Sequence, residues 1–234
     1  MSEEKRIAPE VFVKFLPFLA DVVLDGLAKC MGKGWQKWVK GQLSHKSKPE
    51  ELEEVERAVK CVVIAVQMGL LLAKRQPELV DVGLREIELR GESVDEQWQA
   101  LLEAYQGFLE FDGREYSERG EINPEHFGEF LAYFASCWLR DMSKVMGKEW
   151  QKEWQKWFKN NPLHKVKPEE RAAVKTVGNY AIVAILVGLL LAKKQPELLG
   201  ADWSRGASLD MLWKGMLETY GKFQVDLFYE YFAE

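Results

Sequence analysis

The chain has 234 residues, of which 47% are hydrophobic and 29% are charged, and its formal net charge is −5. This composition is typical of a globular protein and excludes a disordered chain or a fibre. The negative net charge gives no overall attraction to nucleic acid, so charge must be judged locally.

Six of the eight prolines are followed by glutamate, and each of these pairs predicts the first turn of a helix. Proline suits that turn because its missing N–H has no partner there, and glutamate complements the helix dipole. In chain order we expect a long helix from Pro9, a short Trp/Lys helix, and a long central helix from Pro49. A short helix after Pro77 and a closing helix after the capping box Ser93-x-x-Glu96 follow. Strand signals are weak, which predicts an all-α fold.

The same order of elements recurs in the second half of the sequence. Ile7-Ala-Pro-Glu matches Ile122-Asn-Pro-Glu at an offset of 115 residues, and the segment 69–79 matches 188–198 at an offset of 119 with ten of eleven identities. Near residue 90 the offset returns to 115. We therefore predict a tandem duplication of a helical-bundle unit of roughly 115 residues, with about five helices each and pseudo-two-fold symmetry. The expected boundaries are residues 1–111, a linker at 112–121, and residues 122–234.

The central helices are apolar nearly all round, which predicts burial. Residues 176–192 lack charge over a length at the lower limit for a membrane span, but the matching first segment carries Lys60 and Gln67. A buried core helix explains both segments, so we expect no membrane span. Gly69 and Gly188 lie inside these helices. Each is either a tolerated small residue or a point where another helix, such as the other copy's central helix, crosses closely.

The three cysteines are odd in number and form no CxxC pair, and none has a cysteine at the matching position of the other copy. This pattern favours reduced thiols. The N-terminus has no apolar stretch of the kind found in signal peptides. We expect a cytoplasmic protein, and its oligomeric state is left open.

The short Trp/Lys helix carries the most informative charge pattern. Residues 29–48 contain six lysines and no acid, and residues 144–167 contain seven lysines and two glutamates. On a helical wheel the tryptophans fall on one face as inward anchors and the lysines on the opposite face. The candidate anion-binding residues are Lys33, Lys37, Lys40, His45, Lys46, Lys48, Lys148, Lys152, Lys156, Lys159, His164, Lys165 and Lys167.

Three interpretations of these lysines are open. They form a solvated helix face, a surface that neutralises the phosphates of an anionic polymer, or a face that lies on an anionic membrane. No arginine lies on these helices, which argues against bidentate recognition of bases or phosphates. His45 and His164 have no cysteine or second histidine at ligand spacing, so no metal site is expected.

Two resemblances to known families bear on function. Arg119 and His126 match the spacing of the Rx4–6H motif of HEPN ribonucleases, but the pair straddles the linker and the first copy has no equivalent. The segments Gly69-Leu-Leu-Leu-Ala-Lys and Leu101-Leu-Glu-Ala-Tyr resemble, as a loose analogy, the helical small subunits of CRISPR RNA-guided effector complexes. That resemblance implies a non-enzymatic α-bundle that lines a nucleic-acid groove.

No motif for nucleotide binding, serine hydrolase chemistry, zinc proteolysis or a di-metal bundle is present in the sequence. The sequence therefore predicts a non-catalytic protein without cofactor. Its two Lys-rich, Trp-anchored helices are expected to bind an anionic partner, namely nucleic-acid backbone within a larger assembly. The alternative is a protein–protein scaffold or adaptor that binds no nucleic acid.

Overall fold

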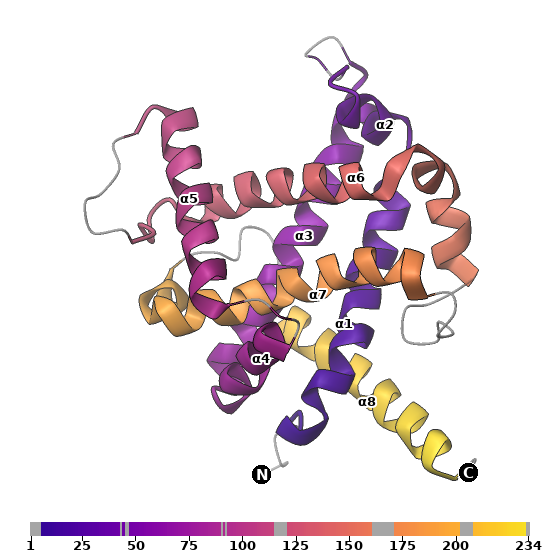
Figure 1. Cartoon of the computed structure of the whole chain (residues 1–234), viewed down its shortest axis with the longest axis vertical. Helices are drawn as coiled ribbons and strands as arrows, with labels where there is room; N and C mark the ends of the chain where they lie inside the picture. The colour runs from indigo at the N-terminus through magenta and orange to yellow at the C-terminus, as the bar shows by residue number, and fades with distance from the viewer. Residues whose placement is uncertain are drawn as a thin grey trace.

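A computed structural model describes residues 6–42, 44, 47–89, 91, 93–114, 121–160, 171–201 and 208–232, with residues 145–160, 171–177 and 227–232 described by their backbone alone. All regular elements in these residues are helices (Figure 1). They are α1 (Pro9–Cys30), α2 (Lys33–Val39), α3 (Pro49–Arg75), α4 (Glu78–Leu89), α5 (Val94–Asp112), α6 (Phe127–Asn160), α7 (Arg171–Lys194), the 3-10 helix η2 (Pro196–Gly200) and α8 (Leu209–Phe232). The all-α prediction is confirmed.

Most helices begin where the proline–glutamate pairs predict. Pro9, Pro49 and Pro196 are first residues of their helices, and α4 begins directly after Pro77. The capping box also forms, because the Ser93 hydroxyl accepts a hydrogen bond of 3.4 Å from the backbone N–H of Glu96. In contrast, Pro124 lies in a turn, and α6 begins three residues later at Phe127. Pro168 lies outside the described residues.

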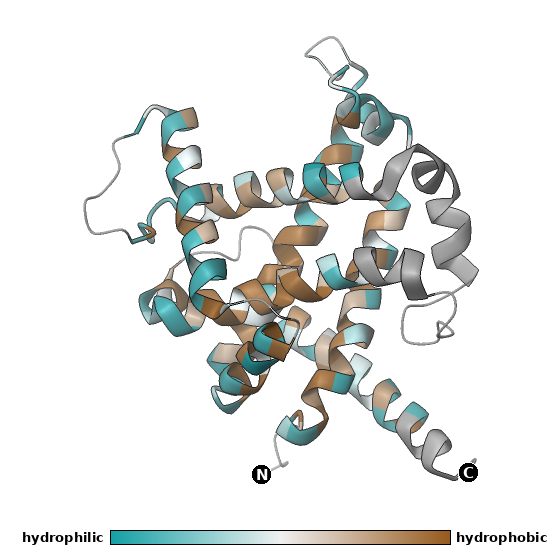
Figure 2. Cartoon of the chain, viewed as in Figure 1, coloured by the Kyte–Doolittle hydropathy of each residue, from teal (hydrophilic) through white to brown (hydrophobic). Residues whose placement is uncertain are grey.

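The two central helices, α3 and α7, cross at the middle of the molecule and make the most extensive helix–helix contact among the described residues. A Cβ atom added to Gly69 would lie only 2.8 Å from the Cα of Gly188, and the reverse addition gives the same distance. The interpretation of a close helix crossing is thus confirmed at both glycines. Leu70, Leu71 and Ile185 are buried around the crossing, and hydrophobic residues concentrate there (Figure 2).

A buried glutamine fixes the start of α1 and of α6. The backbone N–H of Ile7 donates to Gln76 Oε1 at 2.8 Å, and Gln76 Nε2 donates to the Ile7 carbonyl at 2.9 Å. Ile122 and Gln195 make the same two hydrogen bonds, at 2.7 and 3.2 Å. In both places the side-chain amide satisfies a buried backbone donor and acceptor, which would otherwise destabilise the fold. The residue that precedes each long helix is thereby fixed to the end of a central helix.

The helices α5 and α8 each pack mainly on helices of the other half of the chain. α5 lies against α6 and α7, whereas α8 lies against α1 and α3 (Figure 1). The Tyr105 hydroxyl on α5 accepts a 3.0 Å hydrogen bond from the backbone N–H of Asn123. The Tyr220 hydroxyl on α8 accepts one of 3.1 Å from the backbone N–H of Ala8. Side chains from both halves of the chain therefore share one hydrophobic core.

One expected helix boundary is absent. The sequence predicts a separate Trp/Lys helix in each half, but α6 runs without interruption from Phe127 to Asn160. In the first half the helix is interrupted at Met31 and Gly32, since glycine is a poor helix former, and α2 begins at Lys33. At an offset of 119 residues, Gln151 and Glu153 of α6 take the places of Gly32 and Gly34, and both residue types are good helix formers. None of the helices in the described ranges is long and apolar enough to cross a bilayer.

Candidate anion-binding surface

The short helix α2 is anchored to the start of α3 by its tryptophan face. Trp35 is 1% exposed, and Trp38 is half-buried beside it with 5.3 Å between the ring centroids. Gly34 lies directly on the backbone of α3, because a Cβ at this position would be 2.5 Å from the Cα of Glu51. The prediction that tryptophans anchor this helix is confirmed, and glycine allows the close approach.

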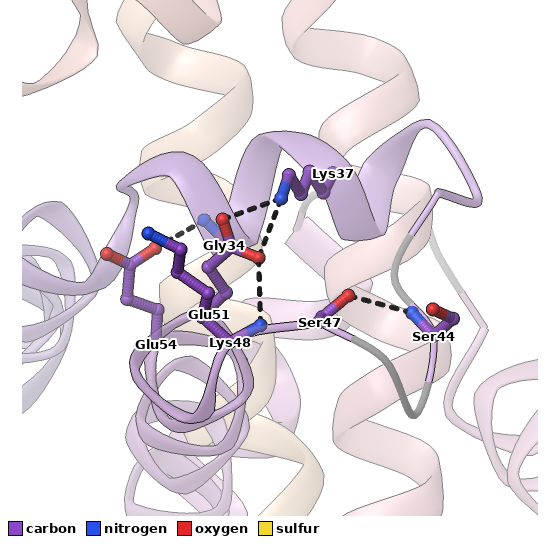
Figure 3. A network of polar contacts seen from close by, with 7 residues as sticks. All are labelled: Gly34, Lys37, Ser44, Ser47, Lys48, Glu51 and Glu54. Atoms are coloured by element: carbon purple, nitrogen blue, oxygen red, sulfur yellow. Dashed lines mark hydrogen bonds and ion pairs between the residues drawn. The ribbon is translucent and has the colours of Figure 1, made fainter.

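Two carboxylates of α3 hold α2 in place (Figure 3). The backbone N–H of Gly34, in the first turn of α2, donates to Glu54 Oε2 at 2.6 Å. The ammonium of Lys37 donates to both carboxylate oxygens of Glu51, at 2.6 and 2.7 Å. The backbone N–H of Lys48 adds a third contact to Glu51 at 3.3 Å. The Lys37 hydrogen bonds hold the pKa of Glu51 below its ordinary value, so the carboxylate is charged at neutral pH.

The lysines predicted to share an outward face have different surroundings. Lys33, Lys40 and Lys48 are exposed. Lys37 is half-buried, and its charge is neutralised by Glu51. Lys37 therefore makes an ion pair with α3 and does not stand free on the outward basic face, and its role in anion binding stays a prediction. A helical wheel describes one helix alone, whereas Lys37 is placed by the docking of α2 on α3. Within the described part of the chain, no carboxylate pairs with Lys33 or Lys40.

Arg140 on α6 contributes a positive charge that the analysis of the Trp/Lys segments missed. Its guanidinium lies 5.8 Å from the ring centroid of Trp38, within the range of a cation–π contact, and its side chain is exposed. Arg140 is distant from α2 in sequence and lies outside both Lys-rich segments. Only the packing of α2 near α6 brings it to this surface.

Acidic side chains at the start of α3 lie close to the basic side chains of α2. Glu50, Glu53 and Glu56 are exposed in the first two turns of α3. Glu51 and Glu54, by contrast, are directed at α2. The surface around α2 is therefore mixed in sign, and among the described residues Lys33, Lys40 and Arg140 have no carboxylate partner. We call these three residues the α2 cation cluster.

The remaining predicted residues are described only in part or not at all. Lys148, Lys152, Lys156 and Lys159 lie in α6, in a stretch whose side chains are outside the described residues. The same holds for the entire residues His45, Lys46, His164, Lys165 and Lys167. The structure therefore brings together only the first-half lysines of the predicted set.

Other candidate chemistry has little support in the described residues. His126 is half-buried in the turn before α6, and Arg119, its partner in the Rx4–6H spacing, lies outside the described residues. No group of three or more histidines, cysteines or acids in the described residues is arranged to hold a metal ion.

Comparison with known proteins finds no matching family model, no matching curated protein and no matching solved structure.

Proposed function

We propose that this is a cytoplasmic, non-catalytic protein that binds an anionic polymer, with nucleic-acid backbone as the partner and a larger assembly as the setting. The proposal rests on the observation that some residues of α2 attach the helix to α3 while others are exposed to solvent. Trp35, Gly34 and Lys37 fix the helix to α3, while Lys33 and Lys40 are exposed without a carboxylate partner among the described residues.

The chemistry of the α2 cation cluster suits phosphate groups. Lysines act as point charges that neutralise phosphates without reading sequence, and binding then releases counterions. Arg140 adds a planar guanidinium that can donate two parallel hydrogen bonds to one phosphate. Because α2 is held by hydrogen bonds from both Gly34 and Lys37, the backbone that carries Lys33 and Lys40 is already ordered before binding.

We also propose that the chain is a tandem duplication with pseudo-two-fold symmetry. Support comes from contacts that occur twice. Each residue of one contact lies 115 or 119 positions from its counterpart in the other. The Gln76–Ile7 and Gln195–Ile122 hydrogen bonds form one such pair, and the close approach of Gly69 to Gly188 lies between matching positions. The ion pairs Arg75–Asp210 and Lys194–Asp95, at 2.8 and 2.6 Å, form another.

The duplication would give the molecule a second basic helix. Lys152, Lys156 and Lys159 follow Lys33, Lys37 and Lys40 by 119 residues, and Glu170 follows Glu51 by the same interval. On this basis Lys152 and Lys159 would be the second-half counterparts of Lys33 and Lys40 in binding a ligand. Two such surfaces on one chain would bind a continuous polymer more tightly than either alone.

A protein–protein scaffold is the alternative function. The mixed sign of the surface around α2 favours it, because the exposed Glu50 and Glu53 repel phosphates and can pair with basic residues of a protein. The net charge of −5 also repels phosphates at long range.

The deciding experiment measures binding of the full chain to fluorescently labelled single-stranded RNA, single-stranded DNA and duplex DNA at low and moderate salt. We expect affinity to fall steeply with salt and to depend little on sequence. The double substitution Lys33→Glu and Lys40→Glu should weaken binding uniformly. It should also flatten the log–log salt dependence by roughly 0.7–0.9 per lost phosphate contact.

The matched control is the double substitution Lys14→Glu and Lys214→Glu, which changes the net charge equally at exposed positions on α1 and α8. It should leave the salt slope unchanged. Absence of salt-sensitive affinity in the wild-type chain would overturn the nucleic-acid proposal in favour of the scaffold. An equal loss of binding in both double variants would remove α2 as the binding surface.

A further inference from the structure

Two of the three cysteines meet at the contact between α1 and α3. Cys30 is the last residue of α1, Cys61 lies in the middle of α3, and each thiol lies close enough to influence the pKa of the other. Gly26, one turn before Cys30, provides the space for this contact. A Cβ at Gly26 would lie 2.9 Å from the Cys61 sulfur. The packing of the two helices therefore directs the Cys61 sulfur against the last turn of α1.

The surroundings of the two thiols differ in solvent access. Cys30 is buried, whereas Cys61 is partly exposed, so an oxidant from solution reaches Cys61 first. Burial raises the pKa of Cys30, and it raises the pKa of Cys61 to about 12. Both thiols are therefore almost entirely protonated at neutral pH, so the pair reacts slowly there and faster as the pH rises. The third cysteine, Cys137, lies on α6 one turn after Tyr133.

We propose that Cys30 and Cys61 form an oxidative modification site, at which a small-molecule disulfide such as oxidised glutathione introduces an intrachain disulfide. In the first step the Cys61 thiolate attacks the oxidant, forms a mixed disulfide and releases one small thiolate. In the second step the Cys30 thiolate attacks the Cys61 sulfur and releases the other small thiolate. The two protons from the cysteines end on the two released thiols, so that two protein thiols are oxidised and one disulfide is reduced.

The cross-link would close a loop that contains all of α2. The chain between Cys30 and Cys61 includes the Lys37–Glu51 and Gly34–Glu54 contacts and two residues of the α2 cation cluster. The disulfide would restrict this segment in the unfolded chain and thereby stabilise the fold. The inference concerns thiol chemistry and does not depend on what the cluster binds.

The test treats the full-length, folded protein with excess oxidised glutathione at neutral and at mildly alkaline pH. After blocking of free thiols and proteolysis, mass spectrometry should find a linked peptide pair containing Cys30 and Cys61, with Cys137 still free. The reaction should accelerate by about tenfold per pH unit, because the thiolate fraction of Cys61 rises in that proportion below its pKa. Thermal unfolding should shift upward by on the order of 5–10 °C.

The variant Cys137→Ser should cross-link like the wild type, whereas Cys61→Ala should show neither the linked peptides nor the thermal shift. Three results would overturn the proposal. They are a stable mixed disulfide on Cys61 without transfer to Cys30, a linkage that involves Cys137, and a linkage that forms only in denaturant. Each is read from the peptide masses of the wild-type chain and does not require that a variant folds.

Discussion

The Lys37–Glu51 ion pair lies at the edge of the protein interior. The Glu51 side chain is 10% exposed and that of Lys37 is 44% exposed, so the carboxylate has lost most of its water while the ammonium has kept part of its hydration. A desolvated carboxylate needs a charged partner, and removal of one partner destabilises more than the pair itself stabilises. Lys37 is therefore a structural residue, in contrast to Lys33 and Lys40.

We predict that Lys37→Met lowers the thermal stability of the chain and that Lys33→Met, its matched control, does not. Methionine retains an apolar stem but cannot donate to Glu51. The pKa of Glu51 is lowered in the folded chain, so pairing stabilises the fold above the ordinary carboxyl pKa. This contribution is lost as the pH falls through the lowered value.

Thermal unfolding followed by circular dichroism across acidic and neutral pH measures this effect. The difference between wild type and Lys37→Met should be largest near neutral pH and should shrink in acid. A difference that is constant with pH, or that Lys33→Met reproduces, would assign the loss to packing or to net charge rather than to the ion pair.

At the scale of the element, the crossing of α3 and α7 depends on the absence of side chains at two positions. Gly69 and Gly188 approach each other so closely that each would meet backbone atoms of the opposite helix if it carried a Cβ. Glycine normally weakens a helix interior relative to alanine. Here its cost is offset by the contact between two long apolar helices.

We predict that Gly69→Ala destabilises the fold by about 1–3 kcal/mol or more, because the added methyl group forces the two central helices apart. The matched control is Gly215→Ala in α8, where a Cβ meets nothing within 4 Å. This change should be neutral or should stabilise by up to about 1 kcal/mol. Chemical denaturation of both variants compares the free energies of unfolding. Equal effects would show that helix propensity, rather than the crossing, governs both sites.

Much at this scale could be predicted from the sequence because it is local. Proline–glutamate pairs set the start of α1 and α3, and Ser93 caps α5. The apolar character of the central helices on nearly all sides predicts that Leu70 and Ile185 are buried, and they are. It does not say which helix covers them, because a buried face is compatible with many partners. The placement of Arg140 over Trp38 depends on such a partner, and the sequence analysis missed it. The sequence analysis also missed the continuity of α6, although the replacement of the first-half glycines by good helix formers is a local signal.

At the scale of the whole molecule, the closing helices join the two halves of the chain. α5 contributes Tyr105 and Phe108 to a cluster with Phe130 of α6, with ring centroids 5.2 and 6.1 Å from that of Phe130. α8 contributes Tyr220 and Phe223 to a cluster with Phe15 of α1, at 5.2 and 5.4 Å. Each half therefore completes its aromatic core with a helix that belongs, by sequence, to the other half.

This exchange of closing helices leads to a prediction about cooperativity. Two independent bundles joined by a linker would unfold separately and would separate when the linker is cut. If instead the halves depend on each other for their cores, the molecule should unfold in one transition. It should also stay assembled after cleavage, since the α3–α7 crossing and both aromatic clusters remain without a covalent link between the halves.

The measurement uses the full chain with a specific protease site placed within residues 115–120, in the expected linker. After cleavage we expect both fragments to elute together at the volume of the uncut protein, which is the control. They should melt in a single transition and separate only under denaturing conditions. The midpoint of the cut protein should also rise with protein concentration, because its unfolding releases two molecules. Separate elution of folded fragments, or two resolved transitions, would mean that α5 and α8 contribute little to the half they pack on.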